Sequence, residues 1–130
     1  MYFKAIWGAE MTKAKLETLS NDELVGLFEK TARDQGRAVL ELDVPEATAA
    51  YHRRAAAFDQ LSLRGRAAQL LLLPLLDHDD PAVRLYTAKR LLRGVAPAQA
   101  RATLEELTKH PQTSFSGDAG MSLDIFDKKI

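Results

Sequence analysis

Two leucine-rich segments of this chain are joined by a turn that must interrupt any helix, Asp77-His78-Asp79-Asp80-Pro81. Proline lacks a backbone N–H and disfavours helix in the residue before it, yet it fits the first turn of a new helix. Asp80 is a suitable N-cap, because its carboxylate can accept from free N–H groups of that turn. Capping and turn formation account for Asp79, Asp80 and Pro81 without a metal ion, and they predict two helices that meet at a tight corner.

The composition favours helix along the whole chain. Its 130 residues include 20 Leu and 20 Ala but only 5 Val and 3 Ile, and the β-branched residues are those that strands prefer. No segment shows sustained alternation, so we expect an all-α protein of about five to six helices with no sheet. We expect one domain over residues 20–127, a partly flexible N-terminal extension over 1–19 and a frayed end over 128–130.

Apolar residues recur at helical spacing in six segments. Ser20 and Glu23 form a capping box before the first of them. Tyr51, Phe58 and Tyr86 lie at helical spacing and are expected in the core. The expected helices cover residues 21–42, 45–65, 66–76, 81–94, 97–110 and 118–126.

An internal repeat of 31 positions is visible in the second half of the chain. A fixed period in this range is typical of stacked helix pairs, in which each pair buries its apolar face against a neighbour. The first half shows no such register, so we expect it to form a divergent capping pair. The shift superposes Leu73 on Leu104, Leu76 on Leu107, Ala88 on Ala119 and Leu92 on Leu123.

The segment from Leu73 to Ala88 resembles a HEAT repeat, with a Leu-rich helix, an Asp-rich turn, then Pro and Val-Arg. The positions that fall on the pattern are Asp79, Val83, Arg84, Ala88 and Leu91. More loosely, the chain is similar to a small bacterial HEAT-like family of unknown function. The capping-box start, the Leu-Pro-Leu-Leu-Asp-His turn and the Asp-Ala-Gly-Met tail carry that similarity.

This resemblance implies a short right-handed α–α superhelix of the HEAT/armadillo type. It also implies a structural place for Arg84 at a helix interface, where it bonds turn carbonyls or Asp79. HEAT-like proteins mostly bind other macromolecules, although a few related folds act as lyases or DNA glycosylases, so the resemblance brings no chemistry.

Several functional classes lack their minimum parts in this sequence. The chain has no Cys, and His52, His78 and His110 lie in three different segments without a nucleophile beside them. We therefore expect no enzyme activity, no catalytic residue, no cofactor and no metal site. The longest apolar run, Leu70 to Leu76, is too short to span a bilayer, and we expect a cytoplasmic protein without membrane contact.

Residues 1–10 leave two readings open. They precede a second methionine, Met11, and can be an optional leader. Alternatively, Phe3, Ile6 and Trp7 form an apolar stripe that docks on the domain or on a partner.

Charge is unevenly distributed along a chain whose formal net charge is +0. Residues 10–46 hold nine acidic and five basic residues, a net charge of −4, whereas residues 52–110 hold six acidic and ten basic ones, a net charge of +4. This pattern predicts a dipolar surface with a basic binding face. The candidate residues of that face are Arg53, Arg54, Arg64, Arg66, Arg90 and Arg93.

A repeat architecture without a catalytic set favours a module that binds another protein, as an inhibitor, an immunity protein or a scaffold. The alternative is a nucleic-acid-binding protein that uses the basic face of residues 52–110. An enzyme of the lyase or glycosylase type is the third hypothesis. A homodimer sealed through Met121, Ile125, Phe126 or Trp7 also stays open.

Overall fold

The computed structural model describes residues 12–111 and 113–128, and none of them lies in a strand. The all-α prediction is therefore confirmed for this part of the chain. The elements are α2 (Lys13–Glu17), α3 (Asn21–Leu40), α4 (Val44–Leu63), α5 (Arg66–Leu70), the 3-10 helix η1 (Leu73–Asp77), α6 (Pro81–Leu92), α7 (Pro97–Thr108) and α8 (Ser116–Phe126).

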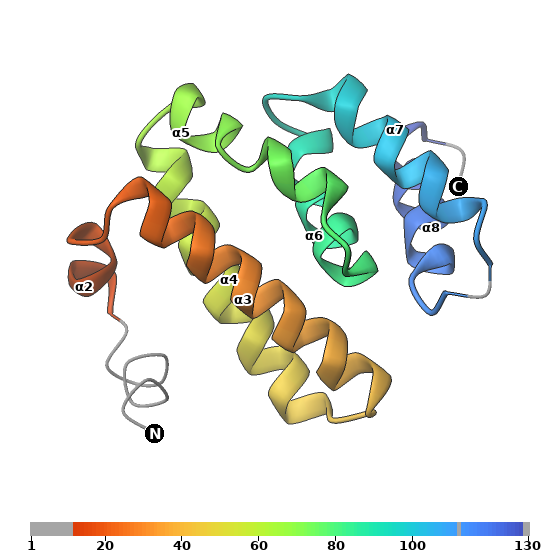
Figure 1. The fold of residues 1–130 in the computed structure, drawn as a ribbon, viewed down its shortest axis with the longest axis horizontal. Helices are drawn as coiled ribbons and strands as arrows, with labels where there is room; N and C mark the ends of the chain where they lie inside the picture. Colours follow the sequence, from red (N-terminus) through yellow and green to blue (C-terminus); the bar gives the residue numbers. More distant parts are fainter. Residues whose placement is uncertain (1–11, 112, 129–130) are drawn as a thin grey trace.

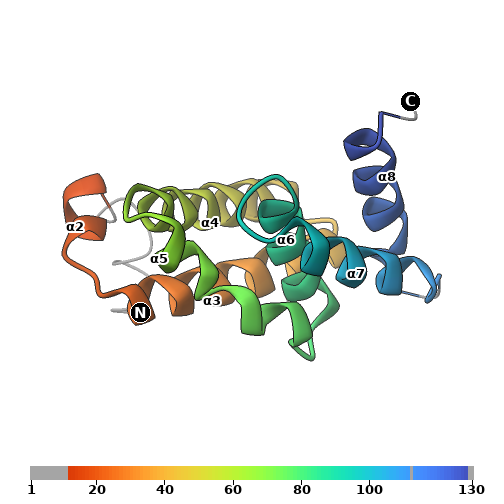
Figure 2. The same cartoon turned by 90° about the horizontal axis from the view of Figure 1, so that it is seen from above.

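The helices follow one another along the long axis of the molecule as successive pairs (Figure 1). The long helices α3 and α4 lie side by side, and α2 packs on α4. The middle of the molecule is formed by α5, η1 and α6, with α6 in contact with α3 on one side and α7 on the other. Seen from above, α8 crosses the end of this row and packs on α7 (Figure 2).

Local capping sets where the main helices begin. The Ser20 hydroxyl accepts from the Glu23 N–H at 3.1 Å, and the Glu23 carboxylate accepts from the Ser20 N–H at 2.8 Å. At α6 the carboxylate of Asp80 accepts from the Ala82 N–H at 2.8 Å, and Pro81 is the first helical residue. These are the short-range signals that the sequence shows, so the helix starts lie close to their expected positions.

The prediction of one helix over residues 66–76 is wrong. The α-helix stops at Leu70, and the chain continues as a 3-10 helix, Leu73–Asp77, with Pro74 in its first turn. Pro74 cannot donate to the carbonyl of Leu70, and its ring clashes with that carbonyl in an α-helix. A continuous apolar run therefore bends here into two short pieces.

Two further differences concern the ends of the chain. Within the expected extension, Lys13–Glu17 is helical and Leu16 is buried against the domain. The expected apolar stripe of Phe3, Ile6 and Trp7 lies outside the described residues. At the other end, α8 begins at Ser116, two residues before its expected start.

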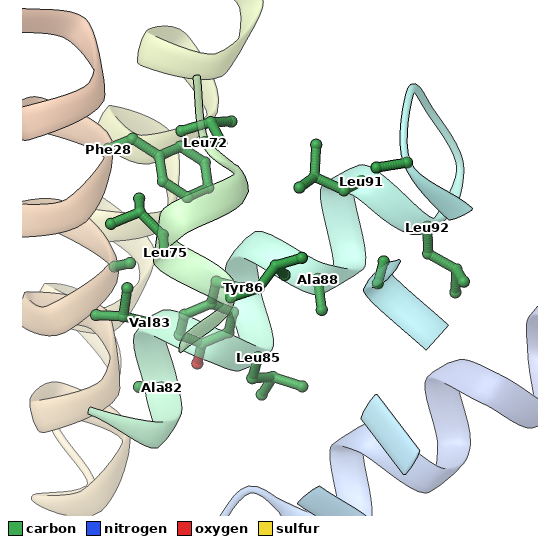
Figure 3. Close-up of a cluster of buried hydrophobic side chains, with 14 of the residues drawn as sticks. Phe28, Leu72, Leu75, Ala82, Val83, Leu85, Tyr86, Ala88, Leu91 and Leu92 are labelled. Atoms are coloured by element: carbon green, nitrogen blue, oxygen red, sulfur yellow. The ribbon is translucent and has the colours of Figure 1, made fainter. Parts of the chain in front are cut away.

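The core runs through all the helix pairs. Phe28, Leu72, Val83 and Leu91 are fully enclosed side chains, and they mark its path from α3 through the junction of α5 and η1 to α6 (Figure 3). Most of the residues related by the 31-residue shift are buried as well, and Leu73 alone is half-buried. Among the described residues, none of the helices combines the length and hydropathy that a bilayer crossing requires.

Side-chain hydrogen bonds hold the Asp-rich turn in place. The Arg84 guanidinium donates to the carbonyl oxygens of His78 at 2.6 Å and Asp79 at 3.2 Å. His78 Nδ1 accepts from the Asp80 N–H at 2.9 Å, so Nε2 carries the proton that is shared with Glu29 at 2.7 Å. This chain of contacts ties the turn to α3.

Candidate functional site

A pocket of about 560 Å³ opens where α3, α4, α6 and the start of α8 meet. The helices α3, α4 and α6 can share this pocket because α3 packs on α4 and also contacts α6. Four cationic side chains line the pocket, Arg54, Lys89, Arg90 and Arg93, and three aromatic ones, Tyr51, Tyr86 and Phe115. Asp118 is the one acidic side chain that the described residues bring to this lining, which leaves a net charge of +3.

Arg54 is the unusual member of this set, because it is only 5% exposed. Its guanidinium carbon lies 4.6 Å from the ring centroid of Tyr86, 5.4 Å from that of Tyr51 and 5.7 Å from that of Phe28. Its Nε donates to the side-chain oxygen of Gln35 at 3.0 Å. A guanidinium stacked on aromatic rings keeps its N–H edge available for in-plane acceptors.

Burial is the main cause that lowers the pKa of Arg54, to about 10, and the positive charge of Arg90 acts in the same direction. Arg54 therefore remains charged near neutral pH while it is largely removed from water. In the described residues it makes no ion pair with a carboxylate. A buried charge without an anion is costly unless a ligand supplies one.

Tyr86 responds to the same surroundings. Burial raises its pKa above the ordinary value of 10.0, while the adjacent Arg54 cation opposes that rise. The phenol is therefore neutral at physiological pH and forms an uncharged wall of the pocket beside the Arg54 cation.

The rim of the pocket is formed by the last turns of α6 and by α8. Arg90 stacks on Phe58, with the guanidinium carbon 4.9 Å from the ring centroid. Lys89 is paired with Asp118 at 2.9 Å. Arg93 is exposed and follows the last residue of α6. Lys89 is thus paired, whereas the three guanidiniums that line the pocket, Arg54, Arg90 and Arg93, have no carboxylate partner among the described residues.

A second depression of about 200 Å³ continues from this rim toward α8. It shares Lys89, Arg93 and Asp118 with the larger pocket and is otherwise lined in part by Met121 and Ile125. Met121 is 56% exposed and Ile125 is 47% exposed. The pocket therefore passes from a cationic floor to an apolar edge.

The six arginines expected on one basic face are not brought together as one. Arg53 donates to Glu46 at 3.2 Å, and Arg66 donates to the Val95 carbonyl oxygen at 3.2 Å. Arg64 binds the Asn21 side chain at 3.0 Å and the last carbonyls of α2. Arg64 and Arg66 join segments distant in sequence and Arg53 pairs within α4, whereas Arg54, Arg90 and Arg93 line the pocket.

Sequence reasoning missed three contributors to the site. Tyr51 was expected in the core but is 43% exposed at the pocket. Gln35 and Asp118 carried no signal, because their roles depend on helices distant in sequence. For Arg54 a signal existed: it shares a helical stripe with Ala50, Ala57 and Leu61, all of which are fully buried.

In the described residues no group of three or more His, Cys, Asp or Glu side chains is placed to hold a metal ion.

Comparison with known proteins gives relatives of this fold but no activity. No curated protein sequence matches the chain. A crystal structure of the protein RPA1889 from Rhodopseudomonas palustris CGA009 is similar to it, with a TM-score of 0.82 and 33% identity, over 87% of this chain and 93% of that one. The family model described as a domain of unknown function, DUF2019, matches residues 22–127. The chain is therefore a member of the DUF2019 family, and it has the all-helical fold seen in its bacterial relative.

Proposed function

We propose that this protein is a non-catalytic module that binds an acidic segment of another protein in the cationic pocket. The observation that carries this proposal is the buried guanidinium of Arg54 at a pocket whose lining has a net charge of +3. Charges of one sign in a concave, partly buried site attract and orient a ligand of the opposite sign. Arg and aromatic side chains are also the residue types that dominate binding energy at protein interfaces.

We further propose that the helix pairs form a short superhelix of the HEAT type, of which this pocket is the binding surface. The residues related by the 31-residue shift support this arrangement, since Ala88 and Ala119 are both fully buried and Leu92 and Leu123 nearly so. Stacked helix pairs expose continuous surfaces that suit macromolecular partners. A role as an inhibitor, an immunity protein or a scaffold fits such a surface.

Nucleic-acid binding is the alternative, and the contacts of the arginines weigh against it. A phosphate backbone is tracked by a stripe of solvated Lys and Arg. Arg53, Arg64 and Arg66 instead donate to groups of this chain. The remaining cations surround one pocket, which fits a single anionic group better than a polyanion.

Affinity capture tests the proposal with two charge-reversed variants of the full chain. The pocket variant is Arg90→Glu/Arg93→Glu. The matched control is Lys13→Glu/Lys15→Glu, which changes the net charge equally but lies on α2, at the opposite end of the molecule (Figure 1). Circular dichroism first shows that both variants are folded.

We expect the wild-type protein and the α2 control to retain the same host protein, and the pocket variant to lose it. Added salt should release the captured protein, because exposed ion pairs are screened. If the pocket variant captured the same host proteins as the wild-type protein, the proposal would be refuted. Retention that disappears after nuclease treatment would favour the nucleic-acid alternative instead.

A further inference from the structure

The Nη atoms of Arg54 have no acceptor among the described residues, although the side chain is 5% exposed. Within the described part of the chain, the one hydrogen bond of this guanidinium comes from Nε, which donates to Gln35. Among the described residues, the polar side-chain atoms that are fully enclosed and unpartnered are the hydroxyls of Thr87 and Thr113. The Nη atoms are not among them, so they are not fully enclosed, and Arg54 is a lining residue of the pocket.

Arg90 lines the same pocket as Arg54, and its positive charge contributes to the lowered pKa of Arg54. Each guanidinium is held in place by aromatic rings, Arg54 by Tyr86 and Tyr51, and Arg90 by Phe58. Two like charges that line one pocket, neither of them paired with a carboxylate of the described chain, form a preorganised anion site. Arg93 adds a third guanidinium at the rim.

We propose that this pocket binds a phosphate monoester, with Arg54 donating from the floor and Arg90 and Arg93 from the rim. The inference rests on the proposed function, because it names the group that the bound segment inserts into the pocket. The aromatic side chains of Tyr51, Tyr86 and Phe115 would contact the organic part that carries the phosphate.

Charge and geometry favour a phosphate over a carboxylate. Asp118 is paired with Lys89, so the positive charges of the three guanidiniums in the lining are not neutralised by it. One carboxylate brings a single negative charge and two oxygens, whereas a phosphate monoester brings a charge of about −1.5 to −2 and three strong acceptor oxygens. Arginine forks bind phosphate in a bidentate manner, and arginine clusters are the usual readers of phosphorylated segments.

The test is a calorimetric titration of the full-length protein with three short peptides of otherwise identical neutral sequence. Their central residue is phosphoserine, glutamate or serine. Free phosphoserine and inorganic phosphate are titrated in parallel. We expect the phosphoserine peptide to bind at least about tenfold more tightly than the glutamate peptide, and the serine peptide not to bind.

The free compounds identify the source of the phosphate. If free phosphoserine binds as tightly as the peptide, a small phosphorylated molecule satisfies the site. If the peptide binds more tightly, the phosphate belongs to a protein segment. Both results support the inference, because phosphate chemistry is common to both.

Variants show whether Arg54 acts on the ligand or only on the fold. Arg54→Lys keeps the positive charge but removes the fork, and Arg54→Met also removes the charge. Arg90→Met removes a rim guanidinium without touching the buried site. We expect each to weaken phosphopeptide binding about tenfold or more, whereas Arg33→Met on the outer face of α3 leaves it unchanged.

Equal affinity for the phosphoserine and glutamate peptides would overturn the inference. It would leave the proposed function standing if protein capture still depends on the pocket charges. Loss of both peptide binding and charge-dependent capture would overturn the two together. Unaltered phosphopeptide affinity in the Arg90→Met and Arg54→Lys variants would also overturn the inference.

Discussion

Gly36→Ala is expected to destabilise this fold, because Gly36 lies where α3 contacts α6. A methyl group built at position 36 would lie 2.2 Å from Cβ of Ala82 and 3.5 Å from Cζ of Phe115. Non-bonded carbon atoms rest at about 3.5–4.0 Å, so α6 would have to retreat by more than about 1 Å. It has little freedom to do so, since Val83 and Tyr86 are buried on the same helix.

The expected loss follows from two opposing effects. Replacing Gly by Ala inside a helix favours folding by about 1 kcal/mol. Forcing an extra methyl group into a well-packed contact costs about 1–3 kcal/mol, and the 2.2 Å approach of two Cβ atoms belongs at the upper end. The net expectation is a free energy of unfolding lower by about 1–2 kcal/mol.

Gly26 on the same helix is a matched control, because a methyl group there meets nothing within 4 Å. Gly26→Ala should raise the free energy of unfolding by about 1 kcal/mol. The double variant Gly36→Ala/Ala82→Gly removes the clash from the other side and should recover most of the stability. Urea unfolding followed by circular dichroism measures all four proteins. If Gly36→Ala were as stable as Gly26→Ala, the helix contact described above would be incorrect.

Four further outcomes are expected. Leu42 has a φ of 59° and is 86% exposed, so Leu42→Gly should raise the free energy of unfolding by about 0.5–1 kcal/mol in urea titrations, by relieving left-handed strain. Thr87 is fully buried and its hydroxyl has no partner among the described residues, so Thr87→Val should stabilise by about 1 kcal/mol in the same assay. The positive charge of Arg54 lowers the pKa of Tyr86, so Arg54→Met should raise that pKa further. An alkaline absorbance titration measures the change, and Tyr86→Phe identifies which transition belongs to Tyr86. Because the pKa of Tyr86 in the folded protein exceeds its ordinary value of 10.0, ionisation of Tyr86 disfavours the folded state. The free energy of unfolding therefore falls as the pH rises through that higher pKa. Phosphopeptide affinity should fall as the pH drops from about 7 to 5, because the phosphate loses a charge near pH 6, whereas the glutamate peptide, with a pKa near 4, should not respond.

The helix pattern could be predicted because its signals are short-range. A capping residue, a proline and the carbonyls that they serve lie within one turn, as at Ser20 and Asp80. The same logic failed at residues 66–76, where leucine periodicity indicated a helix and Pro74 forbade the hydrogen bond that would continue it. In that segment a backbone constraint decided the structure against a favourable side-chain pattern.

The pocket could be predicted only in part, because it joins four elements. Arg90 lies in the last turn of α6 and Arg93 directly follows that helix, and this spacing of one turn is visible in the sequence. Gln35 and Asp118 reach the pocket from distant helices, and no local pattern indicates this. Tyr51 was assigned to the core from its spacing, although the chain leaves that side of α4 open to the pocket.

Counting charges could not separate the arginines that hold the fold from those that face the pocket. Arg53 and Arg66 sit in the same basic region as Arg54 and Arg90, and all four contribute equally to its net charge. What separates them is the acceptor that each guanidinium finds. The first two donate to a carboxylate and to a carbonyl of this chain, whereas the pocket pair lacks a carboxylate among the described residues.

A guanidinium that donates to a carboxylate or a backbone carbonyl of its own chain is engaged in the fold, and fewer of its N–H groups remain for a ligand. A guanidinium that is stacked, partly dehydrated and without an anion keeps a strong preference for one, because burial has already removed the competing water. Arg54 meets this second condition most fully, since it is buried on three aromatic rings and opens onto the pocket. The acceptors that each guanidinium finds, rather than the density of positive charge, therefore distinguish this pocket in a chain whose formal net charge is +0.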